Sequence, residues 1–169
     1  MHLIISTSLR PDCRTLSLAK KALEYFKENN SPAELINLQK MELPFCDGGD
    51  CYKDPEVVSL TEKIDKAESL IIASPVYNYY LNAAAKNLLE LTGSGWKEKV
   101  VGFICNAGGK SSYMSVMPFA DSIMLDYRCK VIPKFVYATG DAFDGIKVVD
   151  TKILDRLDEL VDAAISWAT

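Results

Sequence analysis

The sequence predicts a doubly wound α/β domain built on a parallel sheet. Short β-rich runs alternate with segments of helical period along the chain, and this alternation is typical of parallel sheets covered by helices. The runs Ser69–Ser74 and Val100–Asn106 are almost continuously apolar, as expected for central strands buried on both faces. The 169 residues suit one domain with one sizeable core, so we expect residues 1–169 to form a single domain.

The expected elements follow in order. Five strands are predicted at Leu3–Ser6, Glu34–Asn37, Ser69–Ser74, Val100–Asn106 and Lys134–Ala138. Helices are predicted from Thr15 to Glu28, from Asp54–Pro55 onward, over Ala83–Leu91, from Tyr113 to Tyr127, and from near Asp150. Asp54 as the N-cap residue and Pro55 in the first turn form a strong start signal. Residues 39–53 are expected to form a long polar loop.

Composition excludes several classes of protein. The net charge of −4 and the lack of a basic stripe disfavour nucleic-acid binding. The N-terminus shows no secretory signal pattern, and the longest apolar runs are too short to span a bilayer. The five cysteines are odd in number and scattered, which is unlike a secreted disulfide framework. We therefore expect a cytoplasmic protein with no membrane or nucleic-acid partner and mostly reduced thiols.

In a doubly wound sheet the ligand lies beyond the carboxyl ends of the strands. The loop after the first strand contains Ser8, Arg10 and Arg14, and Thr15, Leu16 and Ser17 begin the next helix. Free amides at a helix N-terminus, hydroxyl groups and two arginines suit a phosphate monoester. The alternative is that the hydroxyls only cap a surface helix while the arginines face water.

Two common phosphate loops are excluded. No G-x-G-x-x-G follows the first strand, so this is not a Rossmann dinucleotide turn. The stretch Ala107–Ser111 resembles a P-loop, but Ile104 stands where that loop needs glycine. A nucleoside triphosphatase is therefore disfavoured.

The loops after the third and fourth strands could hold a flat ring. Pro75, Val76, Tyr77 and Asn78 offer a stiff wall, an aromatic face and an amide. Asn106, Ala107, Gly108, Gly109 and Lys110 allow a close backbone approach and offer N–H donors. The alternative for the first of these loops is that its tyrosines, Tyr79 and Tyr80 above all, pack under the loop or at a subunit contact. The alternative for the loop after the fourth strand is a plain turn.

At these loops the chain resembles the NAD(P)H-dependent FMN reductase family, which includes quinone, chromate and azo-dye reductases. The family motifs G-S-x-R-x-x-S-x-[ST], T-P-x-Y-N-x-S-x-P-x-x-L-K-N-x-[LI]-[DE] and S-x-G-G correspond to Thr7–Thr15, Ser74–Glu90 and Asn106–Gly109. The resemblance covers nearly the whole chain and implies a flavodoxin-like five-stranded sheet in the order 2-1-3-4-5. Thr7, Tyr80 and Asn82 depart from the motifs, where the family has glycine, serine and proline.

The resemblance implies that FMN is bound. Its phosphate would contact Ser8, Arg10, Arg14, Thr15 and Ser17 with Leu16 between them, while Pro75 to Asn78 flank the ribityl chain and ring. Gly108 and Gly109, which follow Asn106 and Ala107 in the cofactor-binding loop, would lie near the pyrimidine edge. Our own hypothesis places Lys110 beside N1 and O2, where a cation favours the reduced flavin.

The resemblance also implies the reaction. NADH or NADPH would give hydride to flavin N5 and leave, and a small acceptor (a quinone, free flavin, azo compound or metal oxyanion) would then take the same face. No protein acid or base is needed, no metal is expected, and the single histidine, His2, is a poor catalyst. A homodimer or homotetramer is usual in the family.

Two alternative functions stay open. A flavodoxin-type electron carrier would use the same architecture, although its T-x-T-G-x-T loop and strongly acidic surface are missing. A flavin-free regulatory or binding protein would keep only the fold. Cys46 and Cys51 lie where related iron–sulfur flavoproteins have four cysteines; two cannot hold such a cluster, so we expect a plain loop and only weakly a redox disulfide.

Overall fold

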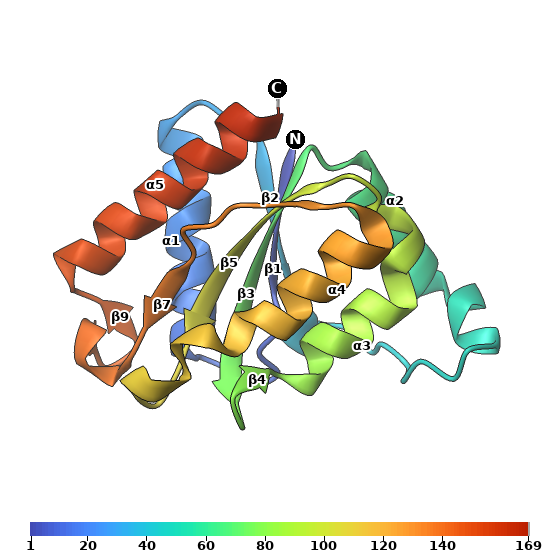
Figure 1. Cartoon of the computed structure of the whole chain (residues 1–169), viewed down its shortest axis with the longest axis horizontal. Helices are drawn as coiled ribbons and strands as arrows, with labels where there is room; N and C mark the ends of the chain where they lie inside the picture. Colours follow the sequence, from blue (N-terminus) through green and yellow to red (C-terminus); the bar gives the residue numbers. More distant parts are fainter. Residues whose placement is uncertain (169) are drawn as a thin grey trace.

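The computed structural model describes residues 1–168 and shows one parallel sheet between two layers of helices (Figure 1). Its strands run in the order β2-β1-β3-β5, with β6 and β7 both pairing with β5 in parallel. This agrees with the expected order 2-1-3-4-5, because the short strand β4 adds only an antiparallel partner to β3. The strands of the sheet are β1 (His2–Ser6), β2 (Ala33–Asn37), β3 (Ser69–Tyr77), β4 (Tyr80–Leu81), β5 (Val100–Asn106), β6 (Lys130–Val131) and β7 (Val136–Ala138).

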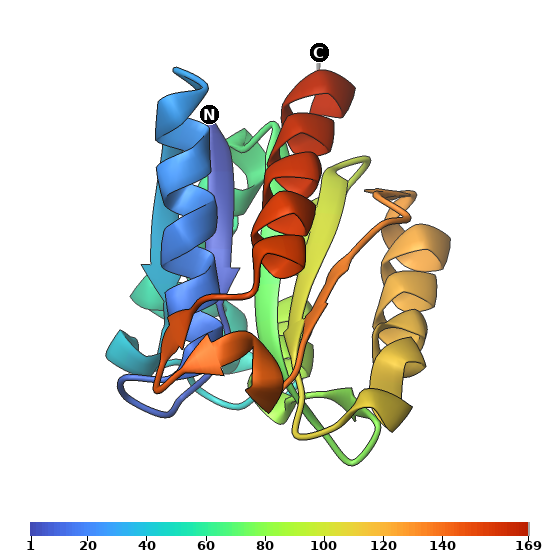
Figure 2. The same cartoon turned by 90° about the vertical axis from the view of Figure 1, so that its left-hand side faces the viewer.

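The helices divide between the two faces of the sheet. They are α1 (Arg14–Glu28), α2 (Pro55–Lys66), α3 (Ala83–Thr92), α4 (Met117–Tyr127) and α5 (Thr151–Ala168). Figure 2 shows α1 and α5 side by side on one face, while α2, α3 and α4 cover the other. Because strand side chains alternate, Leu3 and Ile5 pack toward α2–α4 while Ile4 packs toward α1 and α5. Both faces are therefore apolar, as the continuous runs predicted.

Local signals explain the helix starts. The Asp54 carboxylate accepts hydrogen bonds from the amides of Glu56 and Val57 at 2.8 and 3.3 Å, which confirms the predicted N-cap. Asp150 caps α5 in the same way, through the amides of Lys152 and Ile153. Both helices begin where the sequence predicted.

Three predicted boundaries were wrong. The third strand does not end at Ser74 but continues to Tyr77, and it forms a hairpin with β4 through Asn78 and Tyr79. The helix expected from Tyr113 begins only at Met117, after a 3-10 helix over Lys110–Val116, with Pro118 in its first turn.

The fifth predicted strand, Lys134–Ala138, contains β7 but begins too early, because β7 starts only at Val136. The edge of the sheet is interrupted here: β6 pairs beside Val100 and Val101, and β7 pairs with β5 further along. Pro133 lies in the gap and has no amide to donate to the ladder, which accounts for the break.

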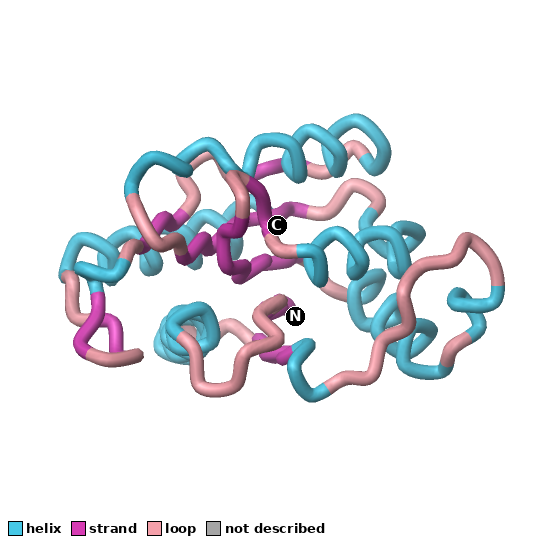
Figure 3. Tube along the Cα trace, turned by 90° about the horizontal axis from the view of Figure 1, so that it is seen from below, coloured by secondary structure: helices cyan, strands magenta, loops and turns pink. Residues whose placement is uncertain are grey.

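Two further features lie at the lower end of Figure 1, where the parallel strands end. A small hairpin of β8 (Phe143–Asp144) and β9 (Lys147–Val148) precedes α5. Figure 3 looks onto this edge and shows the long segment between β2 and α2 running outward on one side. That segment contains short 3-10 helices at Leu38–Lys40 and Asp50–Lys53, separated by residues without regular structure.

Candidate functional site

A cavity of about 410 Å³ lies at the carboxyl ends of β1, β3 and β5. This is the volume of an ordinary small-molecule pocket and the place where ligands bind in such sheets. It is lined by Ser8, Arg10, Asp12, Cys13, Arg14, Thr15, Pro75, Val76, Tyr77, Asn106, Ala107, Gly108, Gly145 and Ile146. Cavities of about 500 and 460 Å³ lie elsewhere, one beside α2 and α3 and one between α1 and β2, and neither joins these three strand ends.

The start of α1 forms the polar end of the cavity. Cys13 is the N-cap residue: its sulfur accepts from the amide of Leu16 at 3.4 Å and its carbonyl from the amide of Ser17 at 3.1 Å. Ser8 and Thr15 are buried, with 3% and 1% of their surface exposed. The helix N-terminus carries partial positive charge, and the first amides have no intrahelical acceptor. This end of the cavity therefore suits an anion.

Arg14 is held in place by the β8–β9 hairpin. Its Nε donates to the carbonyl of Gly145 at 3.0 Å, and its guanidinium carbon lies 5.2 Å from the centroid of the Phe143 ring. A cation over an aromatic face is attracted by the ring quadrupole. With Nε engaged, the terminal guanidinium nitrogens remain the groups that can bind an anion. The hairpin thus orients an arginine at the cavity.

A buried polar network joins the first loop to the third strand. Thr7 Oγ1 donates to Asn82 Oδ1 at 2.7 Å, and Asn82 Nδ2 donates to the carbonyl of Thr7 at 2.7 Å. Ser74 Oγ donates to the same Asn82 oxygen at 3.1 Å, and that oxygen also caps α3 through the amide of Ala85 at 3.2 Å. One side chain therefore fixes the relative position of two cavity walls.

The loop after β5 forms the opposite wall. Among the described residues, Asn106 Oδ1 is one of three buried side-chain nitrogen or oxygen atoms that have no hydrogen-bond partner. A Cβ at Gly108 would meet open space, so the backbone there faces the cavity directly. Tyr137 of β7 donates its hydroxyl to the carbonyl of Gly109 at 2.6 Å and holds the loop. An orphaned acceptor beside open backbone indicates a place for a ligand with hydrogen-bond donors.

The predicted residues are largely brought together, but not all of them. The lining includes Ser8, Arg10, Arg14, Thr15, Pro75, Val76, Tyr77, Asn106, Ala107 and Gly108. Leu16 and Ser17 line other cavities, and Gly109 and Asn78 lie outside the lining. Lys110 is 82% exposed at its side chain, and its ammonium lies 3.3 Å from the Asp141 carboxylate.

The pairing partner of Lys110 has a shifted pKa. A backbone hydrogen bond first, and then the Lys110 ammonium, lower the pKa of the Asp141 carboxyl. Asp141 therefore stays ionised opposite Lys110, which does not line the cavity.

Four lining residues were missed: Asp12, Cys13, Gly145 and Ile146. Cys13 stands where the motif G-S-x-R-x-x-S-x-[ST] has its second serine, so the motif itself carried that signal. Gly145 and Ile146 belong to a hairpin far along the chain, and only folding places them beside Arg14.

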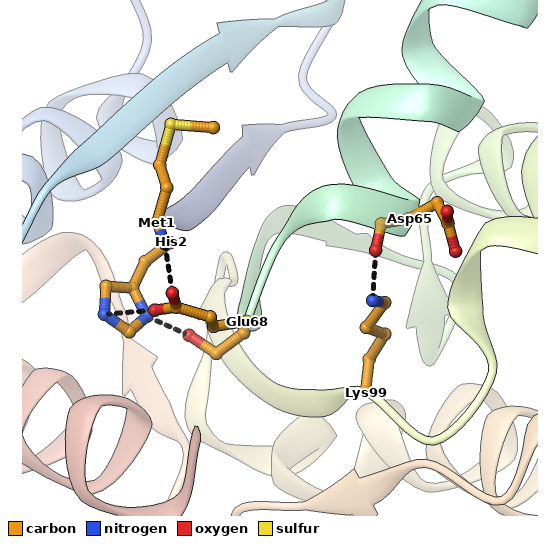
Figure 4. A network of polar contacts seen from close by, with 6 residues as sticks. Met1, His2, Asp65, Glu68 and Lys99 are labelled. Atoms are coloured by element: carbon orange, nitrogen blue, oxygen red, sulfur yellow. Dashed lines mark hydrogen bonds and ion pairs between the residues drawn. The ribbon is translucent and has the colours of Figure 1, made fainter. Parts of the chain in front are cut away.

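The single histidine, His2, lies at the amino end of β1, whereas the cavity lies at the carboxyl ends of the strands. His2 Nδ1 is 2.8 Å from Ser69 Oγ, and Nε2 is 3.6 Å from Glu68, which also pairs with the N-terminal amine at 2.7 Å. Figure 4 shows this group, and beside it Lys99 donating to the carbonyl of Asp65. Burial lowers the pKa of His2. At the amino end of β1 it cannot reach the cavity.

Residues 1–168 contain neither a cluster of metal ligands nor a membrane-spanning helix. No cluster of three or more potential metal-binding side chains occurs in this part of the chain. Within the same residues, no helix is long and apolar enough to cross a bilayer.

The sequence model of one protein family, NADPH-dependent FMN reductase, matches residues 2–144. An NAD(P)H-dependent FAD/FMN reductase of Geobacillus thermodenitrificans is 28% identical over 131 residues, which cover 75% of this chain and 70% of the relative. An NADPH azoreductase of a Bacillus species is 26% identical over 152 residues, covering 89% and 80%.

Among solved structures, the NAD(P)H:acceptor oxidoreductase FerB of Paracoccus denitrificans superimposes with a TM-score of 0.80 at 20% identity, over 99% of this chain and 96% of that one. At this identity the likeness bears on the fold.

Proposed function

The chain belongs to the NADPH-dependent FMN reductase family and is an FMN-dependent NAD(P)H oxidoreductase, and from this premise we propose that the cavity at the ends of β1, β3 and β5 is its FMN site. The observation that carries the proposal is the pairing of an anion-binding helix end with an orphaned acceptor, Asn106 Oδ1, on the opposite wall. FMN has an anion at one end and ring N–H donors at the other, so these residues fit it.

The residues of this chain would bind and orient the cofactor. Ser8, Thr15 and the amides at the start of α1 would hold the phosphate, together with Arg10 and the preorganised Arg14. Pro75, Val76 and Tyr77 would flank the ribityl chain and ring, while Asn106 to Gly108 contact its polar edge. Bound FMN supplies the hydride chemistry between the nicotinamide and the acceptor. The protein contributes position and electrostatics.

The acceptor, location and assembly belong to the proposal too. We assign small acceptors such as quinones, free flavin, azo compounds or metal oxyanions, reduced with NADH or NADPH in alternating half-reactions. A cytoplasmic location agrees with five free cysteines. A homo-oligomer is supported by the exposed apolar side chains of Tyr113, Met114, Met117, Met124 and Leu125 on and before α4.

The test is FMN titration of the apoprotein with the double variant Ser8→Ala, Arg10→Ala. Each charge-assisted hydrogen bond contributes about 1.5–3 kcal/mol, so losing both side chains should weaken FMN binding by about a hundredfold or more. Arg156→Ala, on α5 and paired with Glu159, is the matched control and should bind normally. Unchanged affinity in the double variant would show that the phosphate lies elsewhere.

Two further measurements separate the alternatives. Steady oxidation of NADPH with a quinone distinguishes the reductase from a one-electron carrier. A colourless protein that takes up no FMN would remove both flavin functions.

A further inference from the structure

Cys46 and Cys51 lie in the segment between β2 and α2 and do not line the FMN cavity. Cys51 packs with Val57 and Leu91 in a small apolar cluster, and Cys46 packs against the same cluster. Four residues separate the two cysteines, and they include Gly48 at φ +73°, a backbone conformation that side chains disfavour. Both cysteines, which flank the turn at Gly48, therefore contact the same apolar cluster.

The surroundings of the two thiols differ. Cys46 is half-buried, with its sulfur 3.4 Å from the hydroxyl of exposed Tyr52. Cys51 is 5% exposed, and its amide donates to Asp47 Oδ1 at 3.3 Å. The Asn87 amide of α3 holds this segment, accepting from the amide of Cys46 and donating to the carbonyl of Pro44, both at 2.9 Å. One thiol is therefore accessible and the other is shielded beside it.

The pKa directions match this division. The Tyr52 hydroxyl first, then the backbone of Gly48, lower the pKa of the Cys46 thiol, whereas nearby Glu90 raises it slightly. Burial, and then Asp47, raise the pKa of Cys51. Elsewhere, burial raises the pKa of Cys105 to about 12 and that of Cys129 to about 11. Thiolates are the reactive form, so Cys46 stands apart from the core cysteines.

We propose that Cys46 and Cys51 form a peroxide-reactive dithiol, with Cys46 as the attacking thiolate and Cys51 as the resolving thiol. Cys46 attacks the peroxide, an S–O bond forms as the O–O bond breaks, and the leaving oxygen takes up a proton. Cys51 then attacks the Cys46 sulfur, the S–S bond forms, and the hydroxide leaves as water with the Cys51 proton. Two thiols and one hydrogen peroxide thus give one disulfide and two waters. Bound FMN takes no part in either step.

The first experiment uses the full-length holoprotein without reductant and hydrogen peroxide as the probe. The intact mass should fall by two hydrogen atoms, and peptide mapping should join Cys46 to Cys51 within one chain. Cys51→Ser should leave a sulfenic acid on Cys46 that dimedone traps, and Cys46→Ser should give neither product. Disulfides only between chains, or oxygen addition without a disulfide, would overturn the proposal.

The second experiment removes the hydrogen bond to Cys46 and keeps both cysteines. Iodoacetamide should label Cys46 well before Cys105 and Cys129 in the native protein. Tyr52→Phe should slow labelling of Cys46 several-fold, while Tyr25→Phe, on α1 across the sheet, should not. Labelling of Cys46 at the rate of the core thiols, or no effect of Tyr52→Phe, would contradict the assigned roles, even if the serine variants fold poorly.

Discussion

Thr7 and Asn82 are joined by two hydrogen bonds of 2.7 Å, one in each direction. They are also two of the positions at which the chain departs from the family motifs, which have glycine and proline there. A glycine could not donate to Asn82, and a proline could not accept from Thr7. Each departure therefore supplies the partner that the other needs, and together they tie the phosphate-loop side of the cavity to the start of α3.

Asn82→Ala should destabilise the protein strongly. It removes the shorter of the two hydrogen bonds that Thr7 Oγ1 donates, one of the two that Ser74 Oγ donates, and the side-chain cap of α3. Each such loss at a buried site costs about 1–3 kcal/mol. Urea unfolding should show a lower midpoint. Asn37→Ala removes an exposed cap, on the amide of Gln39, and should change stability far less. Equal effects of the two variants would contradict this account.

Phe143→Ala should weaken FMN binding although Phe143 is outside the cavity lining. The substitution removes the ring beneath the Arg14 guanidinium, an interaction of about 0.5–2 kcal/mol, and frees Arg14 to adopt other rotamers. The affinity for FMN should fall several-fold in titrations, because the phosphate loses part of its contact with Arg14. Phe143→Tyr should restore this affinity. An equal loss of riboflavin affinity, which involves no phosphate, would point to general unfolding instead.

Tyr79→Gly should stabilise the β3–β4 hairpin. Asn78 and Tyr79 both have positive φ, at 51° and 62°, and a non-glycine residue in this region costs about 1–2 kcal/mol. Tyr79 is 53% exposed, so little packing is lost. Thermal unfolding should move to higher temperature. A lower melting temperature would show that the tyrosine ring makes a stabilising contact, such as one with a second subunit.

Lys110→Met tests the predicted role of Lys110 near the ring. If the ammonium favours the reduced flavin, the variant should have a lower midpoint potential, measured by dye-coupled reduction. Asp141→Asn releases Lys110 from its exposed ion pair, worth about 0–1 kcal/mol, and should shift the potential in the opposite direction or leave it unchanged. A potential unchanged in Lys110→Met would remove this role.

His2 should make stability depend on pH. Burial lowers its pKa in the folded protein below the ordinary 6.5, with Glu68 opposing the shift in part. As the pH falls below about 6.5, the unfolded chain takes up a proton that the folded protein resists, so stability is full above this range and declines below it. Urea unfolding at about pH 7.5 and about pH 5.5 should show the decline, and His2→Gln should flatten it.

A second group, Glu68, should affect the pH dependence of stability at lower pH than His2 does. The N-terminal amine lowers the pKa of Glu68, so Glu68 contributes stability that is lost only as the pH falls below its ordinary 4.5. Glu68→Gln should therefore change the profile mainly at this lower pH. A decline between about pH 7.5 and about pH 5.5 that persists in His2→Gln would assign it to another group.

The sequence by itself determined the succession of strands and helices along the chain and the three loops that line the cavity at the strand ends. Those signals are local: apolar runs for buried strands, Asp54 with Pro55 for a helix start, and hydroxyls and arginines after β1. The predicted boundaries failed at Ser74, Tyr113 and Lys134, where hairpin pairing, a 3-10 turn and Pro133 decide the backbone.

Only the tertiary structure decided which side chains meet. Arg14 contacts Gly145 across 131 positions of sequence, Thr7 contacts Asn82 across 75, and Lys110 pairs with Asp141 instead of facing the cavity. Such contacts depend on how distant elements pack, because a hydrogen bond requires its atoms within about 3 Å and sequence spacing does not set that distance. The sequence identified the kinds of residue in the loops, and the packing of distant elements determined which residues they contact.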